Sequence, residues 1–294
     1  MATLKQWVDG ARPRTLPAAI APVAVGTGAA YAMEDANPGN ALLAAVVALA
    51  LQVGVNYAND YSDGIRGTDD DRVGPVRLVG QKLAMPASVK MAAFICFGIA
   101  GLAGLALVTL ANAPWMILVG LVSIIAAWKY TGGSNPYGYL GLGEVFVFIF
   151  FGLVAVLGTT YTQAGRIDAI SVAGAIGVGA VSCAVLVMNN LRDIPGDRES
   201  GKRTLAVRMG DRATRIFYLV LLATSVAAVI AIGLMQPPAF LGLLALAAAV
   251  PAIRVVTGGA LGRDLIPALA STGRYLLAYG VLVGFGLWLV PVLA

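Results

Sequence analysis

The sequence predicts an all-α protein that crosses a membrane nine times as one bundle of helices. Of its 294 residues, 59% are hydrophobic and only 12% are charged, about half the charged fraction of an ordinary soluble domain. Long apolar runs recur along the chain, each near the roughly 20 residues that a spanning helix needs. We therefore expect a single membrane domain over residues 1–294. The runs lie near residues 15–33, 41–60, 88–111, 114–130, 143–163, 168–191, 213–235, 237–257 and 273–293.

The first run could be mistaken for a signal peptide, because basic residues precede it and it ends in AAYAM. Eight further runs follow, so we expect it to be a retained helix. With nine spans, the N-terminus and the loops after spans two, four, six and eight share one side. Of the 20 Lys and Arg residues, only Arg166 falls on the other side. The positive-inside rule then predicts a plasma-membrane protein with its N-terminus in the cytoplasm and its C-terminus outside.

Composition also excludes several kinds of chemistry. The chain has no histidine, which excludes His-ligated zinc and Ser-His-Asp catalysis. Its two cysteines, Cys96 and Cys183, lie inside apolar runs without CxxC spacing, as packed thiols do. Membrane topology explains the net charge of +5, and no arginine-rich arm indicates nucleic-acid binding.

Two acidic clusters close apolar runs on the predicted cytoplasmic side. Residues 56–71 read NYANDYSDGIRGTDDD after the second run, and residues 189–203 read NNLRDIPGDRESGKR after the sixth. Side chains three and four residues apart share one face of a helix. Each cluster is therefore expected to form one polar face, and their recurrence four helices apart indicates a faint internal repeat. The faces consist of Asn56, Asn59, Asp60 and Asp63, and of Asn189, Asn190, Asp193 and Asp197.

The two longest loops, about 64–87 and 194–212, directly follow these clusters. Long loops in compact proteins tend to be functional, so we expect them to cap whatever binds at the acidic helix ends. They carry basic side chains that can bind phosphate oxygens. These are Arg66, Arg77, Lys82, Lys202 and Arg203.

The residues alone favour chemistry on a lipid diphosphate. Carboxylates bind Mg²⁺, which completes its coordination shell with water and phosphate oxygens. Two ions, one on each cluster, would bind a single diphosphate, and an allylic diphosphate could then ionise inside the bundle, away from water. A cation-coupled transporter is the alternative from another class. Transporter sites usually lie near mid-membrane in broken helices, whereas these clusters lie at helix ends.

The motifs NDYSDGIRGTDDD and NNLRDIPGDRESGKRT resemble those of the UbiA superfamily of intramembrane prenyltransferases, nearly end to end. Three stretches narrow the resemblance to the branch that prenylates 1,4-dihydroxy-2-naphthoate in menaquinone synthesis: ARPRTLPAAIAPVAVG at 11–26, YTGGSNPYGYLGLGE at 130–144 and GRYLLAYG at 273–280. The resemblance implies nine helices and Mg²⁺-dependent transfer from polyprenyl diphosphate, releasing diphosphate and CO₂ and giving demethylmenaquinone. Hydroxybenzoate and homogentisate stay open as alternative acceptors.

The resemblance also implies roles at the diphosphate end of the site. One Mg²⁺ would be held by Asp60 and Asp63, and the other by Asp193 and Asp197. The asparagines expected to orient these groups and the diphosphate are Asn56, Asn59 and either Asn189 or Asn190. The basic residues expected to bind the diphosphate are Arg66, Lys202 and Arg203.

At the acceptor end, the expected contacts come from the link between the fourth and fifth runs. Tyr130 would contact the naphthol ring or face the carbocation. Lys129 would pair with the acceptor carboxylate or with Glu144. Tyr139 is the third expected contact from this link, and Asp69 in the first loop is a further one. The sequence names no general base, prenyl-chain length or oligomeric state.

Overall fold

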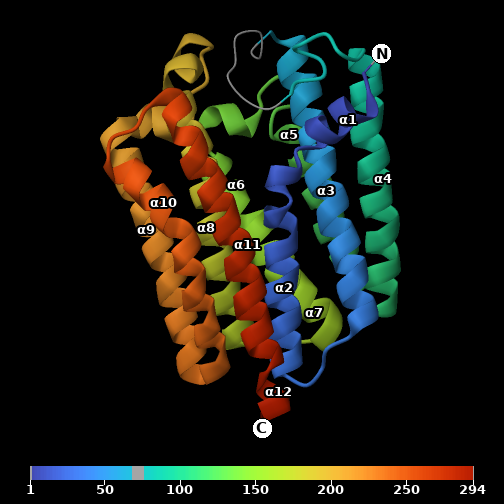
Figure 1. Cartoon of the computed structure of the whole chain (residues 1–294). Helices are drawn as coiled ribbons and strands as arrows, with labels where there is room; N and C mark the ends of the chain where they lie inside the picture. Colours follow the sequence, from blue (N-terminus) through green and yellow to red (C-terminus); the bar gives the residue numbers. More distant parts are fainter. Residues whose placement is uncertain (1, 68–75, 294) are drawn as a thin grey trace.

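The computed structural model describes residues 2–67 and 76–293, which form helices and no strand. The helices stand side by side, with the N-terminus at one end of the bundle and the C-terminus at the other (Figure 1). The α-helices are α1 (Leu4–Ala11), α2 (Pro17–Ala32), α3 (Pro38–Ile65), α4 (Pro86–Leu110), α5 (Met116–Lys129), α6 (Gly143–Val147), α7 (Gly158–Ala164), α8 (Ala169–Glu199), α9 (Leu205–Met235), α10 (Leu246–Thr257), α11 (Ile266–Trp288) and α12 (Val290–Leu293). Between them lie the 3-10 helices η1 (Pro13–Thr15), η2 (Tyr137–Leu140), η4 (Pro237–Ala245) and η5 (Gly262–Leu265), and the π-helical η3 (Phe148–Leu157).

Helices form at all nine expected places, but nine spans are not confirmed. Among the described residues, seven helices are long and apolar enough to cross a membrane. An eighth candidate is the pair Leu4–Thr15 and Pro17–Ala32, which is bent by 48°. The remaining place, expected at 114–130, holds α5 with only 14 residues. At 1.5 Å per residue, that helix is shorter than the roughly 30 Å hydrocarbon core.

Side-chain caps determine where the two helices with acidic ends begin. The side chain of Asn37 accepts a hydrogen bond from the Asn40 amide at 3.0 Å, and Pro38 follows at the first position of α3. Asp168 accepts from the Ser171 amide at 2.8 Å at the start of α8. Such caps satisfy amides that have no partner within the helix.

The bundle has two large apolar cores and a small third one around Val23, Ala44 and Leu107, and α8 is the central helix of the largest. In the most apolar 18-residue window of α8, 72% of the residues are buried, more than in any other candidate span of the described chain. α8 packs against α2, η3, α9 and α11. The second core joins α3 and α4 to α1 and to the residues just before α4. α2 contacts both α3 and α8 and so connects the two halves.

The stretch at 273–280 belongs to the packing of α11. A Cβ on Gly280 would lie 2.4 Å from the Cα of Ala21, so α2 and α11 cross closely, as small residues allow in membrane bundles. On its other side, α11 is bonded to α9, because the Tyr275 and Ser225 hydroxyls lie 2.8 Å apart. The motif therefore serves the fold.

The expected loops are shorter than predicted. α3 continues to Ile65, and residues 76–85 precede α4. Residues 68–75, including the predicted contact Asp69, lie outside the described residues. α8 continues to Glu199 and α9 begins at Leu205, so most of 194–212 is helical. A non-helical residue, Gly210 (φ 78°), bends the first turns of α9 away from the rest.

Candidate functional site

The acidic ends of α3 and α8 lie at the same end of the bundle as the N-terminus (Figure 1). Two connections between other helices lie at this end as well. They are residues 130–142 between α5 and α6, and residues 200–204 between α8 and α9. Both connections contribute side chains or carbonyls that contact the acidic residues. The structure thus brings together segments about 140 residues apart in the chain.

Asp63 is the point where the first and second motifs meet. The Tyr139 hydroxyl donates to Asp63 Oδ1 at 2.6 Å, and Lys202 Nζ lies 3.7 Å from the same oxygen. Lys202 Nζ also lies 4.5 Å from the centre of the Tyr139 ring, a favourable cation–π position. Asp63 and Lys202 are both buried. A buried carboxylate and a buried cation therefore share one small polar site.

Asn59 and Arg66 bind the connection between α5 and α6. The Thr131 hydroxyl donates to Asn59 Oδ1 at 2.7 Å. The Arg66 guanidinium donates to the carbonyls of Thr131 and Gly133 and lies 5.5 Å from the centre of the Tyr139 ring. Gly133 has φ 83°, a conformation that glycine adopts without strain. These contacts hold the connection against α3.

In the second motif, Asp197 shapes the connection to α9. The Asp197 carbonyl accepts from the Lys202 amide at 2.8 Å, and Asp197 Oδ2 accepts from the Thr204 hydroxyl at 3.4 Å. The Arg203 amide donates to the Tyr139 carbonyl at 3.0 Å. Asp197 thereby positions Lys202 beside Asp63.

Asp193 forms two bonds with its neighbour Arg192, from Nε at 2.6 Å and from a terminal nitrogen at 2.8 Å. The two side chains are only 13% and 6% exposed, so this is a nearly buried pair. Arg192 lies one position before Asp193 in the sequence and so off its line on the helix, which favours a role in setting membrane topology. The structure shows instead that Arg192 bonds directly to Asp193.

Asn190 contacts a residue to which sequence reasoning gave no site role. Its side-chain nitrogen donates to Glu144 Oε1 at 2.9 Å, whereas that of Asn189 donates back to the Val185 carbonyl at 3.2 Å. Glu144 is buried at the start of α6, and its Oε2 has no hydrogen-bond partner in the described part of the chain. The sequence signal that could have identified Glu144 is its position as a single acidic residue at the start of an apolar run.

Asn56 and Asp60 form their hydrogen bonds with other segments. Asp60 is fully buried, and its two oxygens accept from the Leu78 and Val79 amides at 2.7 and 3.0 Å. The Asn56 side chain donates to the Ala11 carbonyl and the Thr15 hydroxyl, both at 2.9 Å. The four polar residues of α3 fall within about 100° around the helix axis, but they contact two different sets of residues. Asp60 as a partner of Asp63 on one Mg²⁺ stays a prediction that these contacts do not support.

The residues predicted to contact the acceptor lie in different parts of the site. Tyr130 packs edge-on against Tyr137 at 5.5 Å, and Tyr137 stacks on Phe146 at 3.9 Å, so aromatic rings lead from the connection into the bundle. Burial raises the pKa of the Tyr137 phenol above its usual range, so Tyr137 stays a neutral donor, here to the Ala126 carbonyl. Tyr139 lies instead at Asp63.

Lys129 is exposed at the end of α5. Within the ranges described it forms no ion pair with Glu144, whose Oε1 accepts from Asn190. Of its two expected partners, only the acceptor carboxylate therefore remains for Lys129.

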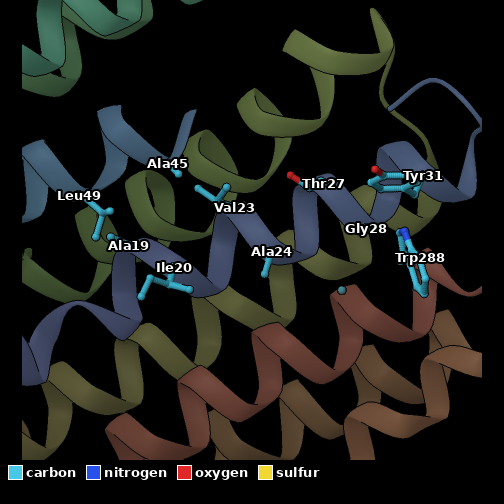
Figure 2. Close-up of a pocket in the computed structure, with 11 residues that line it drawn as sticks. Ala19, Ile20, Val23, Ala24, Thr27, Gly28, Tyr31, Ala45, Leu49 and Trp288 are labelled. Atoms are coloured by element: carbon cyan, nitrogen blue, oxygen red, sulfur yellow. The ribbon is translucent and has the colours of Figure 1, made fainter. Parts of the chain in front are cut away.

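An apolar groove of about 300 Å³ runs along α2 between α3 and α11 (Figure 2). Ala19 and Leu49 line one end, and Tyr31 and Trp288 line the other. Leu49 is one helical turn from Gln52, whose side chain bonds to Thr15 near the acidic end of α3. The Ala19 and Leu49 end of the groove is thus the one nearer to the acidic end of α3, with Leu49 about 21 Å from Asp63 along the helix at 1.5 Å per residue.

The acidic groups do not form one multidentate metal cluster. Among the described residues, no three His, Cys, Asp or Glu side chains converge closely enough to hold an ion. Mg²⁺ usually takes only one or two carboxylates and completes its shell with water and phosphate oxygens. The separate carboxylates at the ends of α3 and α8 fit that donor set.

Residues 19–264 match the UbiA prenyltransferase family. Over 283 residues, the chain is 56% identical to a Mycobacterium tuberculosis protein named 1,4-dihydroxy-2-naphthoate octaprenyltransferase, covering 96% of this chain and 97% of that protein. An Escherichia coli protein of the same name is 42% identical over 225 residues, covering 74% and 73%. The solved structure of a UbiA homologue from Archaeoglobus fulgidus, bound to GPP and Mg²⁺, has a TM-score of 0.70 at 14% identity and covers 96% of this chain and 99% of that one. This structural likeness shows the fold alone.

Proposed function

The chain belongs to the UbiA prenyltransferase family, and we propose that it transfers a polyprenyl group from polyprenyl diphosphate to 1,4-dihydroxy-2-naphthoate. The products are diphosphate, CO₂ and demethylmenaquinone, formed as its quinol. The observation that carries this assignment is the 56% identity to a protein of that named activity over 96% of this chain. It favours this acceptor over hydroxybenzoate or homogentisate, and an enzyme over a cation-coupled transporter.

Mg²⁺ is the proposed cofactor, and Asp63, Asp193 and Asp197 are its proposed carboxylate ligands. Asn59 lies on the same side of α3 as Asp63, with its amide oxygen fixed by Thr131. When bound, Mg²⁺ neutralises the negative charge that develops on the leaving diphosphate.

The protein's own cations bind the outer oxygens of the diphosphate. Lys202 is buried beside Asp63, and Arg66 reaches the same ring of Tyr139 from the other motif. Charge-assisted hydrogen bonds from ammonium and guanidinium groups are among the strongest available to a phosphate. Arg203 is exposed and follows Lys202 directly, which puts it at the rim of the site. Together these residues hold the leaving group at the ends of α3 and α8.

The aromatic row of Tyr130, Tyr137 and Phe146 provides the acceptor surface. Ring faces stabilise a nearby carbocation, and the apolar bundle excludes water from it. The bond between the first prenyl carbon and diphosphate breaks. The same prenyl carbon forms the new bond to the ring carbon that bears the acceptor carboxylate. The electron pair of the ring–carboxylate bond returns to the ring as CO₂ leaves.

The polyprenyl tail lies in the groove along α2. Between Ala19 and Tyr31, α2 rises about 18 Å at 1.5 Å per residue, so the groove accommodates several prenyl units in contact with Val23 and Leu49. The diphosphate end of the tail lies at the acidic helix ends, on the side that the positive-inside rule makes cytoplasmic. The enzyme is then a plasma-membrane protein with its N-terminus inside.

The test is an assay on protein purified in detergent, with farnesyl or longer diphosphate and Mg²⁺. Dihydroxynaphthoate and hydroxybenzoate are offered in parallel, and products are identified by mass spectrometry. We expect a prenylated naphthoquinol that lacks the carboxylate and is lost on addition of EDTA. Product from hydroxybenzoate alone would contradict the assigned acceptor, and no product from either would contradict the assigned reaction.

A further inference from the structure

Residues Arg77–Ala84, here called the docked segment, pack against the acidic end of α3 without forming a helix, and their first three residues are buried. Leu78 is fully buried, and Arg77 and Val79 are only 5% and 8% exposed. The segment is bonded within itself, because the Leu83 and Ala84 amides both donate to the Leu78 carbonyl at 2.9 Å. It is therefore a compact turn and not an extended connection.

Asp60 holds the first residues of this turn. Its two carboxylate oxygens accept from two successive amides, Leu78 at 2.7 Å and Val79 at 3.0 Å. Asp60 has no exposed surface. A buried carboxylate is stable only when its oxygens are hydrogen-bonded, and bonds from backbone amides to a charged acceptor are strong. Both oxygens of Asp60 are thus committed to the docked segment.

Two glycines shape the surface that receives the segment. A Cβ on Gly64, one turn after Asp60, would lie 2.5 Å from Val79 Cγ1 and 3.1 Å from the Gly80 nitrogen. A Cβ on Gly10 in α1 would lie 2.8 Å from Leu78 Cδ1. Real Cβ atoms do not approach so closely, so the segment docks as it does only with glycine at position 64, whereas a Cβ at position 10 would require the Leu78 side chain to shift.

The Asn56–Asp60–Gly64 side of α3 is therefore a docking face, and it also binds the N-terminal residues through Asn56. We infer that Asp60 is a positioning residue, which holds the docked segment, with its buried Arg77, on the end of α3 that also carries Asp63. Its carboxylate serves the assembly of the site and not the binding of Mg²⁺. The effect of this docking on the diphosphate rests on the function proposed above, but the docking itself does not.

Hydrogen–deuterium exchange tests the docking without metal or substrate. The peptide that contains the Leu78 and Val79 amides is followed by mass spectrometry in the wild type, Asp60→Asn, Asp63→Asn and Gly64→Ala. We expect these amides to exchange roughly ten-fold faster in Asp60→Asn, because Asn replaces one acceptor oxygen by a donor that faces an amide. Gly64→Ala should show the same change with Asp60 intact, and Asp63→Asn should exchange like the wild type.

Matched controls keep the result interpretable. Gly98→Ala makes the same substitution on α4, where a Cβ meets nothing within 4 Å, and should leave exchange unchanged. If Asp60→Asn does not fold, Gly64→Ala alone decides. Unchanged exchange in the folded Asp60→Asn protein, or in Gly64→Ala, would overturn the inference.

The kinetic consequence is measured separately. Gly64→Ala and Asp60→Asn should both raise the KM for polyprenyl diphosphate, by roughly ten-fold, since both displace the same segment. An unchanged KM in both variants would contradict the effect on the site. Absence of product in the wild type would contradict the proposed function and leave the exchange result standing.

Discussion

The two sides of the last turns of α3 carry the same residue types and have different partners. On the docking face, Asn56 and Asp60 bond to the Ala11 carbonyl, Thr15 and the docked segment. On the adjacent line of side chains, about 60° around the helix axis, Asn59 and Asp63 bond to Thr131, Tyr139 and Lys202. The first set of partners lies 18 to 45 residues away in sequence, and the second lies 72 to 139 residues away.

Helix geometry explains the difference. Residues three apart are rotated by about 60° around the axis, and residues four apart by about 40° in the other direction, because each residue turns about 100°. Asn56 and Asp60 thus form one line along α3, and Asn59 and Asp63 form another. A carboxylate on the second line reaches the polar site, and one on the first line reaches a loop. Identical spacing in a motif therefore does not imply identical chemistry.

The largest expected effect of a single change is at Asp63. Asp63→Asn keeps the volume but removes a buried charge at the point where the motifs meet, so turnover should fall on the order of 10²- to 10³-fold. The measurement is the rate of prenylnaphthoquinol formation at saturating substrates. A rate within a factor of two of the wild type would remove Asp63 from the machinery and erase the contrast with Asp60.

Lys202→Met should have the next largest effect. The buried ammonium is the proposed charged donor to the diphosphate, and such bonds contribute about 1.5–3 kcal/mol, so the KM for polyprenyl diphosphate should rise roughly ten-fold or more. The matched control is Arg198→Gln, an exposed cation on the last turn of α8, which should change that KM less than two-fold. Equal effects in both variants would mean that general charge matters and not the position of Lys202.

Substitutions of two threonines, one bonded to each line of polar residues on α3, should have smaller effects than Lys202→Met and should differ from each other. Thr131→Val removes the hydroxyl that donates to Asn59, and turnover should fall about five-fold for the loss of about 1 kcal/mol. Thr15→Val removes the hydroxyl that accepts from Asn56, and should lower the melting temperature while turnover stays within about two-fold. Kinetics and thermal unfolding in detergent check both. The reverse pattern would contradict the division between the sides.

The smallest effect is expected at Lys129. An exposed lysine contributes at most about 1 kcal/mol to an ion pair, so Lys129→Ala should raise the KM for dihydroxynaphthoate by roughly two- to five-fold. The KM for polyprenyl diphosphate should not change. Steady-state kinetics with each substrate varied in turn distinguish the two, and an unchanged acceptor KM would remove Lys129 from the acceptor site.

Hydropathy predicted the helices well, because each long apolar run has only one way to satisfy its backbone in a bilayer. Span counting was less successful at α5, whose 14 residues sit in an apolar stretch long enough to suggest a full crossing. The loop expected at 194–212 is mostly helix, since its polar residues have helical propensity that a hydropathy pattern does not register.

The sequence also predicted that two acidic helix ends would come together, as Asp63 and Lys202 do, but not the partners of each residue. The direction of Asp60 depends on amides of Leu78 and Val79, which lie in a segment without periodicity. The bond between Asn190 and Glu144 joins residues 46 positions apart, and only the fold brings them together. Local pattern identifies polar groups, whereas tertiary packing decides which of them meet.

The most direct test of the division within α3 is the Mg²⁺ concentration that gives half-maximal turnover, measured for the wild type, Asp60→Asn and Asp63→Asn at saturating substrates. If Asp63 is a Mg²⁺ ligand and Asp60 positions the docked segment, Asp63→Asn should require roughly ten-fold more Mg²⁺ or more. Asp60→Asn should keep the wild-type requirement within about two-fold, whatever its maximal rate. An increase in Asp60→Asn that equals or exceeds the increase in Asp63→Asn would contradict the account.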